Sequence, residues 1–222
     1  MVKKMNKLIF KLLEAESIEI FADNNIDLKK IDYCCDDVKA YFLNNKEELL
    51  CIGEQTAGLL LEAFIGVLKK AVDCKLQLHE SIKQNLGFMS NEYYHNSPYE
   101  KPEFIMVSTS DDSCQYWVGS NYEIWAVSSG SNQYVSTWMY NDDEGNIVFE
   151  VTKFYKWSLR EKEPEDLDFI TYEEFMKDYT PLIHRVIPRD VAIEWLEQAM
   201  KIHRGFFSTE EDYQKLCKML NW

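Results

Sequence analysis

The sequence has 222 residues, 46% of them hydrophobic and 14% aromatic, with a formal net charge of −14. A chain of this length can bury a full core, and this apolar fraction excludes disorder as a description of the whole chain. Its negative charge opposes binding to nucleic acid and to anionic membranes, because their phosphates would be repelled. We therefore expect neither of these as a partner, whereas a basic protein would suit the charge.

The N-terminal segment 3–15 is predicted to be a helix. Its apolar residues fall on one helical face: Met5, Leu8, Ile9, Leu12 and Leu13. Lys7 and Lys11 interrupt the apolar centre that a secretory signal peptide would need, so we expect a cytoplasmic protein. The short apolar run at 18–21 fits a strand or another helical turn, and periodicity does not decide between them.

A long central helix is predicted over residues 47–73, because this segment is apolar on most sides. Gly53, Gly58 and Gly66 each weaken a helix by roughly 1 kcal/mol relative to alanine, so close packing against a neighbour is expected to compensate. A shorter helix over 79–86 would end at Gly87.

Five segments rich in β-branched and aromatic residues follow: 103–109, 114–119, 122–128, 133–140 and 146–155. The short polar connections between them favour an antiparallel meander. In the last segment apolar residues alternate with Glu150 and Thr152, as in a sheet with one buried face. Phe154 breaks this alternation, so the strand is expected to end, or to bulge, near Lys153.

Capping patterns predict three helices after residue 170. Thr171 with Glu174 has capping-box spacing before a short helix. Pro188 suits the first position of a second helix, which extends to about residue 203. Ser208 with Glu211 repeats the capping-box spacing before a last helix that ends near residue 220.

These elements predict an α+β fold in one domain spanning residues 1–222. Helices from both ends of the chain would pack on the antiparallel five-strand meander at about 103–155. If the chain divides, the division is expected within 95–102. It would then separate a helical subdomain, 1–95, from a second unit, 102–222, that contains the sheet and the C-terminal helices.

Motifs that carry known chemistry do not occur in the sequence. The four histidines are never spaced i, i+4, and the six cysteines include no C-x-x-C pair. Nucleophile-elbow, dinucleotide-binding and P-loop motifs are also absent. We therefore predict no metal site, no cofactor, no catalytic residue and no enzymatic activity, with the cysteines as free thiols.

One stretch of the chain joins aromatic residues directly to a run of acids. Residues 142–178 contain twelve acidic and five basic residues, so half of the net charge lies there. A solvated acidic loop is the plainer interpretation, but an acidic rim around exposed aromatic side chains would also steer and hold a basic protein. The candidate partner-binding residues are Asp142, Asp143, Glu144, Tyr155, Trp157, Glu161, Glu163, Asp166 and Asp168. The other tryptophans of this region, Trp117, Trp125 and Trp138, are expected in the core.

Several segments together resemble a known class of protein. These are "GEQTAGLLLEAF", "NEYY" ahead of the aromatic strands, "VFEVTKFYKW" with "ITYEEFMKDY", and the closing "IPRDVAIEWLEQA". Over residues 47–200 the layout resembles the immunity proteins of bacterial polymorphic and contact-dependent toxin systems. The resemblance implies a cytoplasmic, non-enzymatic protein that binds one cognate toxin domain, often a nuclease. No toxin-contacting residue can be transferred by motif.

The leading hypothesis is therefore an inhibitor that binds and neutralises a basic toxin domain. One alternative is an enzyme of unrecognised type with a cleft between the sheet and the N-terminal helices. Burial of His184 or His95 beside a carboxylate and a cysteine would favour that alternative. A scaffold or regulatory module with another protein partner is the second alternative. The sequence favours no particular oligomeric state.

Overall fold

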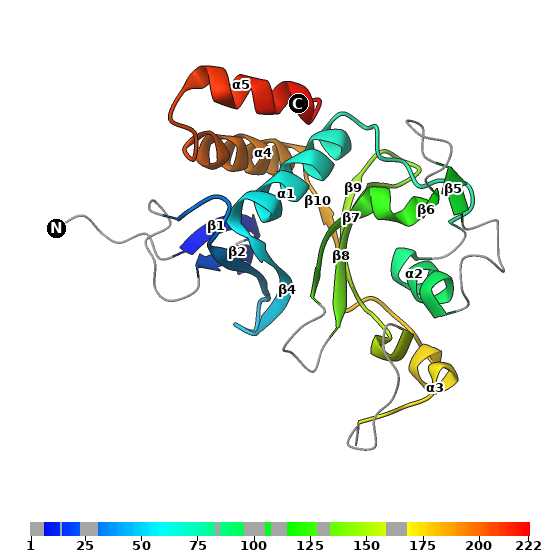
Figure 1. Ribbon diagram of the computed structural model, residues 1–222. Coiled ribbons are helices and arrows are strands. Elements are labelled where there is room, and N and C mark those ends of the chain that lie inside the picture. Colours follow the sequence, from blue (N-terminus) through cyan, green and yellow to red (C-terminus); the bar gives the residue numbers. More distant parts are fainter. Residues whose placement is uncertain are drawn as a thin grey trace.

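The computed structural model describes residues 7–13, 15–22, 31–82, 85–95, 105–107, 115–127, 134–158 and 168–222. In this part of the chain the fold is α+β, with two four-stranded antiparallel sheets, a small two-stranded sheet and five α-helices (Figure 1).

The first sheet is a meander with the strand order β1-β2-β3-β4. Its strands are β1 (Lys7–Leu13), β2 (Glu16–Ala22), β3 (Asp37–Leu43) and β4 (Leu49–Thr56). The helix predicted over 3–15 is therefore wrong. Leu8, Phe10 and Leu12 are buried and alternate with exposed Lys7 and Lys11, which is the period of a strand. The predicted helical face included Leu8, Ile9 and Leu12, and pairing with β2 decides in favour of the strand.

The long helix predicted over 47–73 forms only in its second half. Residues 49–56 are β4, and helix α1 (Ala57–Val72) begins directly after it. An apolar segment without clear periodicity fits a buried strand as well as a buried helix, and here the chain uses it for both. Gly53 lies in β4, where an added Cβ atom would stand 2.7 Å from Cγ of Trp125.

The second sheet has the strand order β10-β9-β8-β7. Its strands are β7 (Glu123–Val127), β8 (Val135–Asn141), β9 (Ile147–Lys153) and β10 (Ile183–Ile187). The five predicted strand segments all contain strands, and β9 ends at Lys153 as expected, but they do not form one meander. β5 (Ile105–Val107) pairs only with β6 (Gln115–Trp117), and the 3₁₀ helix η4 (Val118–Tyr122) separates β6 from β7. The fourth strand, β10, comes from beyond the acidic region.

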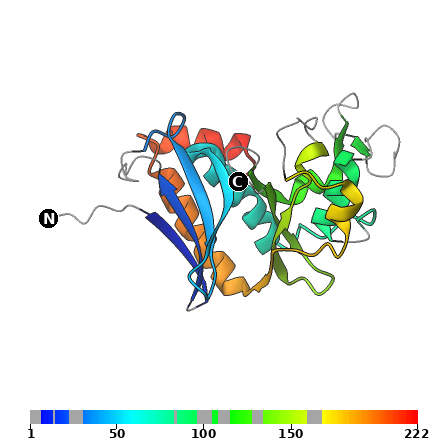
Figure 2. The same cartoon turned by 90° about the horizontal axis from the view of Figure 1, so that it is seen from below.

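Both faces of the second sheet are covered, so the expectation of one buried face is wrong. On one face it packs against the first sheet, where the rings of Phe42 and Phe149 stack with centroids 6.0 Å apart. On the other face Trp138 donates a 2.8 Å hydrogen bond from Nε1 to Oγ1 of Thr152. Figure 2 shows the first sheet and the region of α2 and α3 on opposite sides of the second sheet. Trp117, Trp125 and Trp138 are all buried, as predicted.

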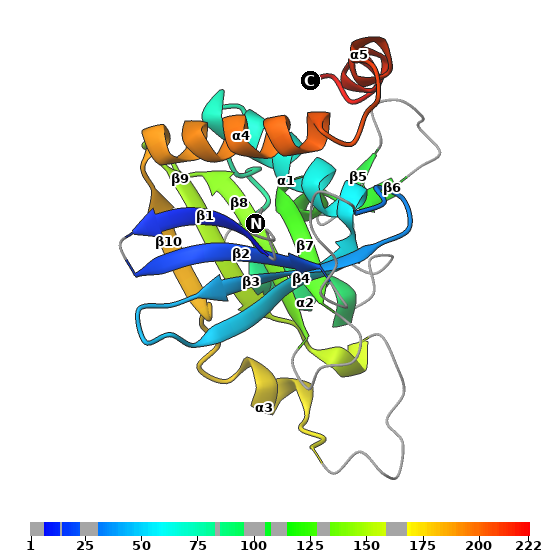
Figure 3. The same ribbon diagram turned by 90° about the vertical axis from the view of Figure 1, so that its left-hand side faces the viewer.

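The helices form two groups. Helices α1, α4 (Arg189–Arg204) and α5 (Glu210–Met219) lie together at one end of the molecule (Figures 1 and 3). Helices α2 (Leu86–His95) and α3 (Tyr172–Met176) lie beyond the second sheet. The Thr171–Glu174 capping box is confirmed. The last helix is instead capped by Thr209, which accepts from the N–H of Asp212. The helix predicted over 79–86 is wrong, because α2 begins at Leu86 and Gly87, expected after the helix end, lies in its first turn.

Polar side chains join the two sheets at their edges. Arg185 of β10 binds the buried carboxylate of Glu16 with two hydrogen bonds of 2.9 and 2.8 Å. Trp195 and Gln198 of α4 donate to the backbone carbonyls of Lys11 and Ile9, so this helix covers the free edge of β1. The buried apolar residues of both sheets and of α1 and α4 belong to one continuous core.

Candidate functional site

The chain that leaves β9 is held by a single buried amide on α2. Asn91 is fully buried, and its Oδ1 accepts the backbone N–H of Tyr155 at 2.7 Å. Its Nδ2 donates to the carbonyls of Lys153 and Gly87 at 3.0 and 2.8 Å. One side chain therefore sets the direction in which the aromatic segment after β9 continues.

Tyr155 is the centre of a small aromatic cluster, and its exposed fraction is only 4%. Its hydroxyl donates to the carbonyl of Ile170 at 2.9 Å. Its ring lies 5.2 to 5.5 Å, between centroids, from the rings of Trp157, Tyr172 and Phe175. Burial raises the pKa of Tyr155, and Glu173 and Glu174 add to this effect. The expectation that Tyr155 is a partly exposed anchor is therefore wrong, since its position after β9 places it under α3.

A groove of about 240 Å³ opens beside this cluster. Its aromatic and aliphatic walls are Tyr134, Phe154, Tyr155, Trp157, Ile170 and Phe175. A second hollow of about 200 Å³ extends from it toward Glu123, and Tyr134 and Phe154 line both. The two hollows share these two wall residues, and we call them together the aromatic groove.

Charged residues surround the aromatic groove. Lys156 forms an ion pair with Asp168, and its Nζ also lies 4.3 Å from the ring centroid of Trp157. Glu123 lines the far end of the groove, and burial raises its pKa. Trp157 is half-buried, and its Nε1–H has no hydrogen-bond partner within the described ranges. An unpaired buried donor costs free energy, so this indole is the least satisfied polar group of the groove.

The predicted partner-binding residues do not all meet at this groove. Tyr155, Trp157 and Asp168 do. Asp142, Asp143 and Glu144 lie in the β8–β9 turn, at the opposite end of a hairpin in which Asn141 pairs with Ile147 and Val135 with Lys153. Strands of this length separate the two ends by roughly 20 Å. Glu161, Glu163 and Asp166 lie outside the described residues.

Asp142 has a structural role in its turn. Its carboxylate accepts from the side-chain amide of Asn146 at 2.9 Å and from the backbone N–H groups of Asn146 and Glu144 at 2.8 and 3.0 Å. These hydrogen bonds, that of the Asn146 side chain first, lower the pKa of Asp142. This carboxylate closes the hairpin turn.

Sequence reasoning did not name four wall residues as part of the site: Tyr134, Phe154, Ile170 and Phe175. It also missed Asn91, whose amide holds the backbone at Lys153 and Tyr155. The register of the β8–β9 hairpin could have shown that Tyr134 and Phe154 are neighbours, because the backbone N–H of Phe154 donates to the carbonyl of Tyr134 at 2.8 Å. The other wall residues and Asn91 carry no local signal, since they reach the groove from α2 and from the segment around α3.

The histidines named for the enzyme alternative are not buried. The side chain of His184 is 54% exposed and lies 3.0 Å from the buried Glu150 carboxylate, whose pKa is raised by burial. His95 is exposed and stacks on Tyr172 with centroids 3.7 Å apart. The fully buried histidine is His203, whose Nε2 lies 3.7 Å from Oε1 of Glu62.

Comparisons with protein-family models, with curated proteins and with solved structures find no match to this chain. Over the described ranges, no three or more His, Cys, Asp or Glu side chains gather as a metal-binding group. In the same part of the chain, none of the helices has the length and apolar character to cross a membrane. The cysteines with described surroundings are free thiols: Cys34, Cys35, Cys51, Cys74 and Cys217.

Proposed function

We propose that this chain is a non-enzymatic cytoplasmic immunity protein that binds and blocks one basic toxin domain, such as a nuclease. The proposal rests on the class resemblance of residues 47–200, on the net charge of −14, and on the aromatic groove. The groove is the observation that carries it, because it supplies a specific docking surface where charge alone would supply only attraction.

The groove has the properties of a pre-organised protein-binding surface. Aromatic side chains dominate binding hot spots because they bury large areas while few torsions become fixed. Here Tyr155 is already fixed by hydrogen bonds from its backbone to Asn91 and from its hydroxyl to Ile170. Trp157 is held against Tyr155 and Phe169. A partner would therefore lose little entropy in ordering this surface.

The described rim favours a basic partner. Glu173 and Glu174 are exposed near Tyr155, against Lys153, while Asp168 and Lys156 at the groove pair with each other. Rim carboxylates of this kind raise the association rate of a positively charged protein, and salt weakens the effect.

The proposal is tested by co-expression with toxin domains encoded beside this gene. Growth of cells that express the toxin domain should be restored by this chain, and the two purified proteins should form a stoichiometric complex. Lack of protection together with lack of a complex, for a neighbouring toxin domain that is active in the same cells, contradicts the proposal.

The docking surface is tested by substitutions at the two ends of the β8–β9 hairpin. Asp168→Lys and Glu173→Lys should slow association with the toxin domain, most strongly at low salt, because they reverse rim charges at the groove. Asp143→Lys and Glu144→Lys, at the far end, are the matched controls and should leave the association rate nearly unchanged. Equal effects at both ends would mean that only net charge matters.

Trp157→Ala tests the anchor. The dissociation rate should rise, with a loss of about 2 kcal/mol of binding free energy or more if the indole is buried by the partner. Met219→Ala removes an apolar side chain that is 78% exposed on α5, and it should not affect binding. Unchanged binding of Trp157→Ala would exclude the groove as the docking site. Urea denaturation of the same variant measures how much Trp157 contributes to the core.

A further inference from the structure

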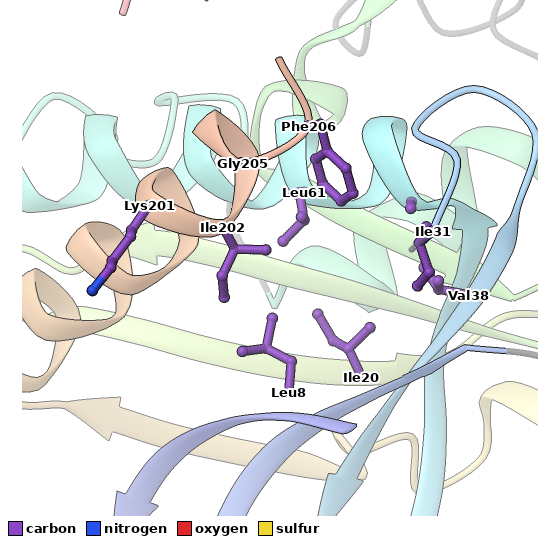
Figure 4. Close-up of a pocket in the computed structure, with 10 residues that line it drawn as sticks. Leu8, Ile20, Ile31, Val38, Leu61, Lys201, Ile202, Gly205 and Phe206 are labelled. Atoms are coloured by element: carbon purple, nitrogen blue, oxygen red, sulfur yellow. The ribbon is translucent and has the colours of Figure 1, made fainter. Parts of the chain in front are cut away.

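A separate hollow of about 310 Å³ lies between the first sheet and helices α1 and α4 (Figure 4). Strands β1, β2 and β3, helix α1 and the end of α4 each contribute apolar walls: Leu8, Ile20, Val38, Leu61, Ile202 and Phe206. Its volume lies at the lower end of the range of small-molecule sites, about 300–1,000 Å³. Its apolar walls and its size make it a candidate binding site for an apolar small molecule.

The hollow opens beside the last turns of α4. The strand residues and Leu61 are buried, whereas Ile202 and Phe206 are half-buried and Lys201 and Gly205 are exposed. Figure 4 shows Lys201 at one end of the hollow with its ammonium group directed away from the apolar side chains. In the described part of the chain Lys201 has no acidic partner.

We propose that this hollow binds a single-chain amphiphile with a carboxylate head, a fatty acid in chemical terms. The chain would lie among the apolar walls, and the carboxylate would meet Lys201 at the rim. A methylene group occupies about as much space as a water molecule, roughly 30 Å³, so a chain of about ten carbons fits. Lys201 is the charged residue in the lining of the hollow, so the carboxylate is placed there.

The experiment measures binding of saturated fatty acids of increasing length to the full chain by calorimetry, below their critical micelle concentrations. Each added methylene that finds room should tighten binding about fourfold, up to about ten carbons, after which the affinity should level off. The primary alcohol of the same length should bind more weakly. Lys201→Glu should remove that preference for the carboxylate, and Lys177→Glu, a charge reversal on an exposed residue after α3, should retain it.

Filling the hollow is the second arm. Ala57→Leu adds three carbons at the wall of the hollow and should weaken binding of the longest fatty acids at least tenfold. The midpoint temperature of thermal unfolding should stay unchanged. If this variant does not fold, Val38→Leu carries the same test. An affinity that ignores chain length, binding that appears only above the micelle concentration, equal binding of alcohol and carboxylate, or full binding by a folded filled variant would each overturn the proposal.

Discussion

The stability of the fold should depend on the protonation of one buried histidine. His203, near the end of α4, is fully buried. It lies among five aromatic rings, with centroids 5.1 to 6.4 Å away: Tyr33, Phe206, Phe207, Tyr213 and Trp222. Its Nδ1 has no hydrogen-bond partner among the described residues, and its Nε2 lies 3.4 Å from the Tyr33 hydroxyl. Burial lowers the pKa of His203 to about 4.

The sign and size of the effect follow from the two protonation equilibria. In the unfolded chain the imidazole titrates near pH 6.5, so between about pH 6.5 and 4 the unfolded state binds the proton and the folded state does not. Acidification through this window therefore destabilises the fold. From about pH 7.5 to about pH 5, the contribution of His203 should fall by about 2 kcal/mol. Glu62 offsets little of this, because at 3.7 Å it is beyond hydrogen-bond distance and burial raises its own pKa.

The assay is urea denaturation at both pH values for the wild type, His203→Phe and His203→Gln. Other groups titrate as well, so the informative quantity is the difference between the pH dependence of the wild type and that of the variants. The two variants should agree with each other in pH dependence, even if their absolute stabilities differ, because neither side chain titrates. If the wild type loses no more stability on acidification than both variants do, the imidazole is not held neutral by burial.

Three further outcomes follow from particular contacts. Gly53→Ala should lower the free energy of unfolding by about 1–3 kcal/mol, because its Cβ would press on the buried Trp125. Gly66→Ala in α1 should raise the free energy of unfolding by up to about 1 kcal/mol, because the added Cβ would lie 3.8 Å from the nearest atom, Nε1 of Trp222. Equal effects of the two glycine substitutions would contradict this packing. Arg185→Met should lower the free energy of unfolding by about 2 kcal/mol above pH 5, because it leaves the buried Glu16 carboxylate, 4% exposed, without its partner. The 38% exposure of Arg185 moderates this loss. The Arg185 contribution holds the pKa of Glu16 below its usual value, so it should fade as the pH drops below about 4.5, and a pH-independent loss would refute the charge argument. Tyr155→Phe should cost about 1 kcal/mol in denaturation for the lost bond to Ile170, and no loss would show that the hydroxyl is solvated.

The strands between residues 105 and 153 could be predicted from the sequence because their turns are local. Polar connections flank every strand between residues 105 and 153, and turn chemistry marks strands whatever they pair with. In the N-terminal sheet, Asn44 marks the β3–β4 turn, but residues 7–22 contain no glycine, proline or asparagine to mark the end of β1. Leu8 and Leu12 satisfy a helical and a strand period at once, whereas Phe10 fits the strand alone, and pairing with β2 separates the two. The sequence analysis did not predict β10, because this five-residue segment forms a strand through its pairing with β9.

The candidate site shows a second limit of the sequence analysis, which concerns residues that are close in the chain but distant in the fold. Three of the residues named from the sequence, Tyr155, Trp157 and Asp168, line the aromatic groove together. The sequence analysis also grouped Asp142, Asp143 and Glu144 with them, since they are close in the chain. A hairpin places its turn and its open end at opposite edges of a sheet, so residues close along the chain become distant in space. Charge counted along the sequence is therefore a poor guide to charge on a surface.

The two proposed sites lie on opposite sides of the second sheet, which makes their tests independent. The aromatic groove is built from the ends of β8 and β9, α2 and the segment around α3, and the apolar hollow from the first sheet, α1 and α4. Among the described residues none lines both, and the second sheet lies between the first sheet and the region of α2 and α3 (Figure 2). Distant substitutions without shared contacts act additively to within about 0.5 kcal/mol. Trp157→Ala should therefore leave fatty-acid binding unchanged, and Ala57→Leu should leave binding of the toxin domain unchanged. A coupling clearly larger than that between the two would show that both ligands bias one conformational change through the sheet.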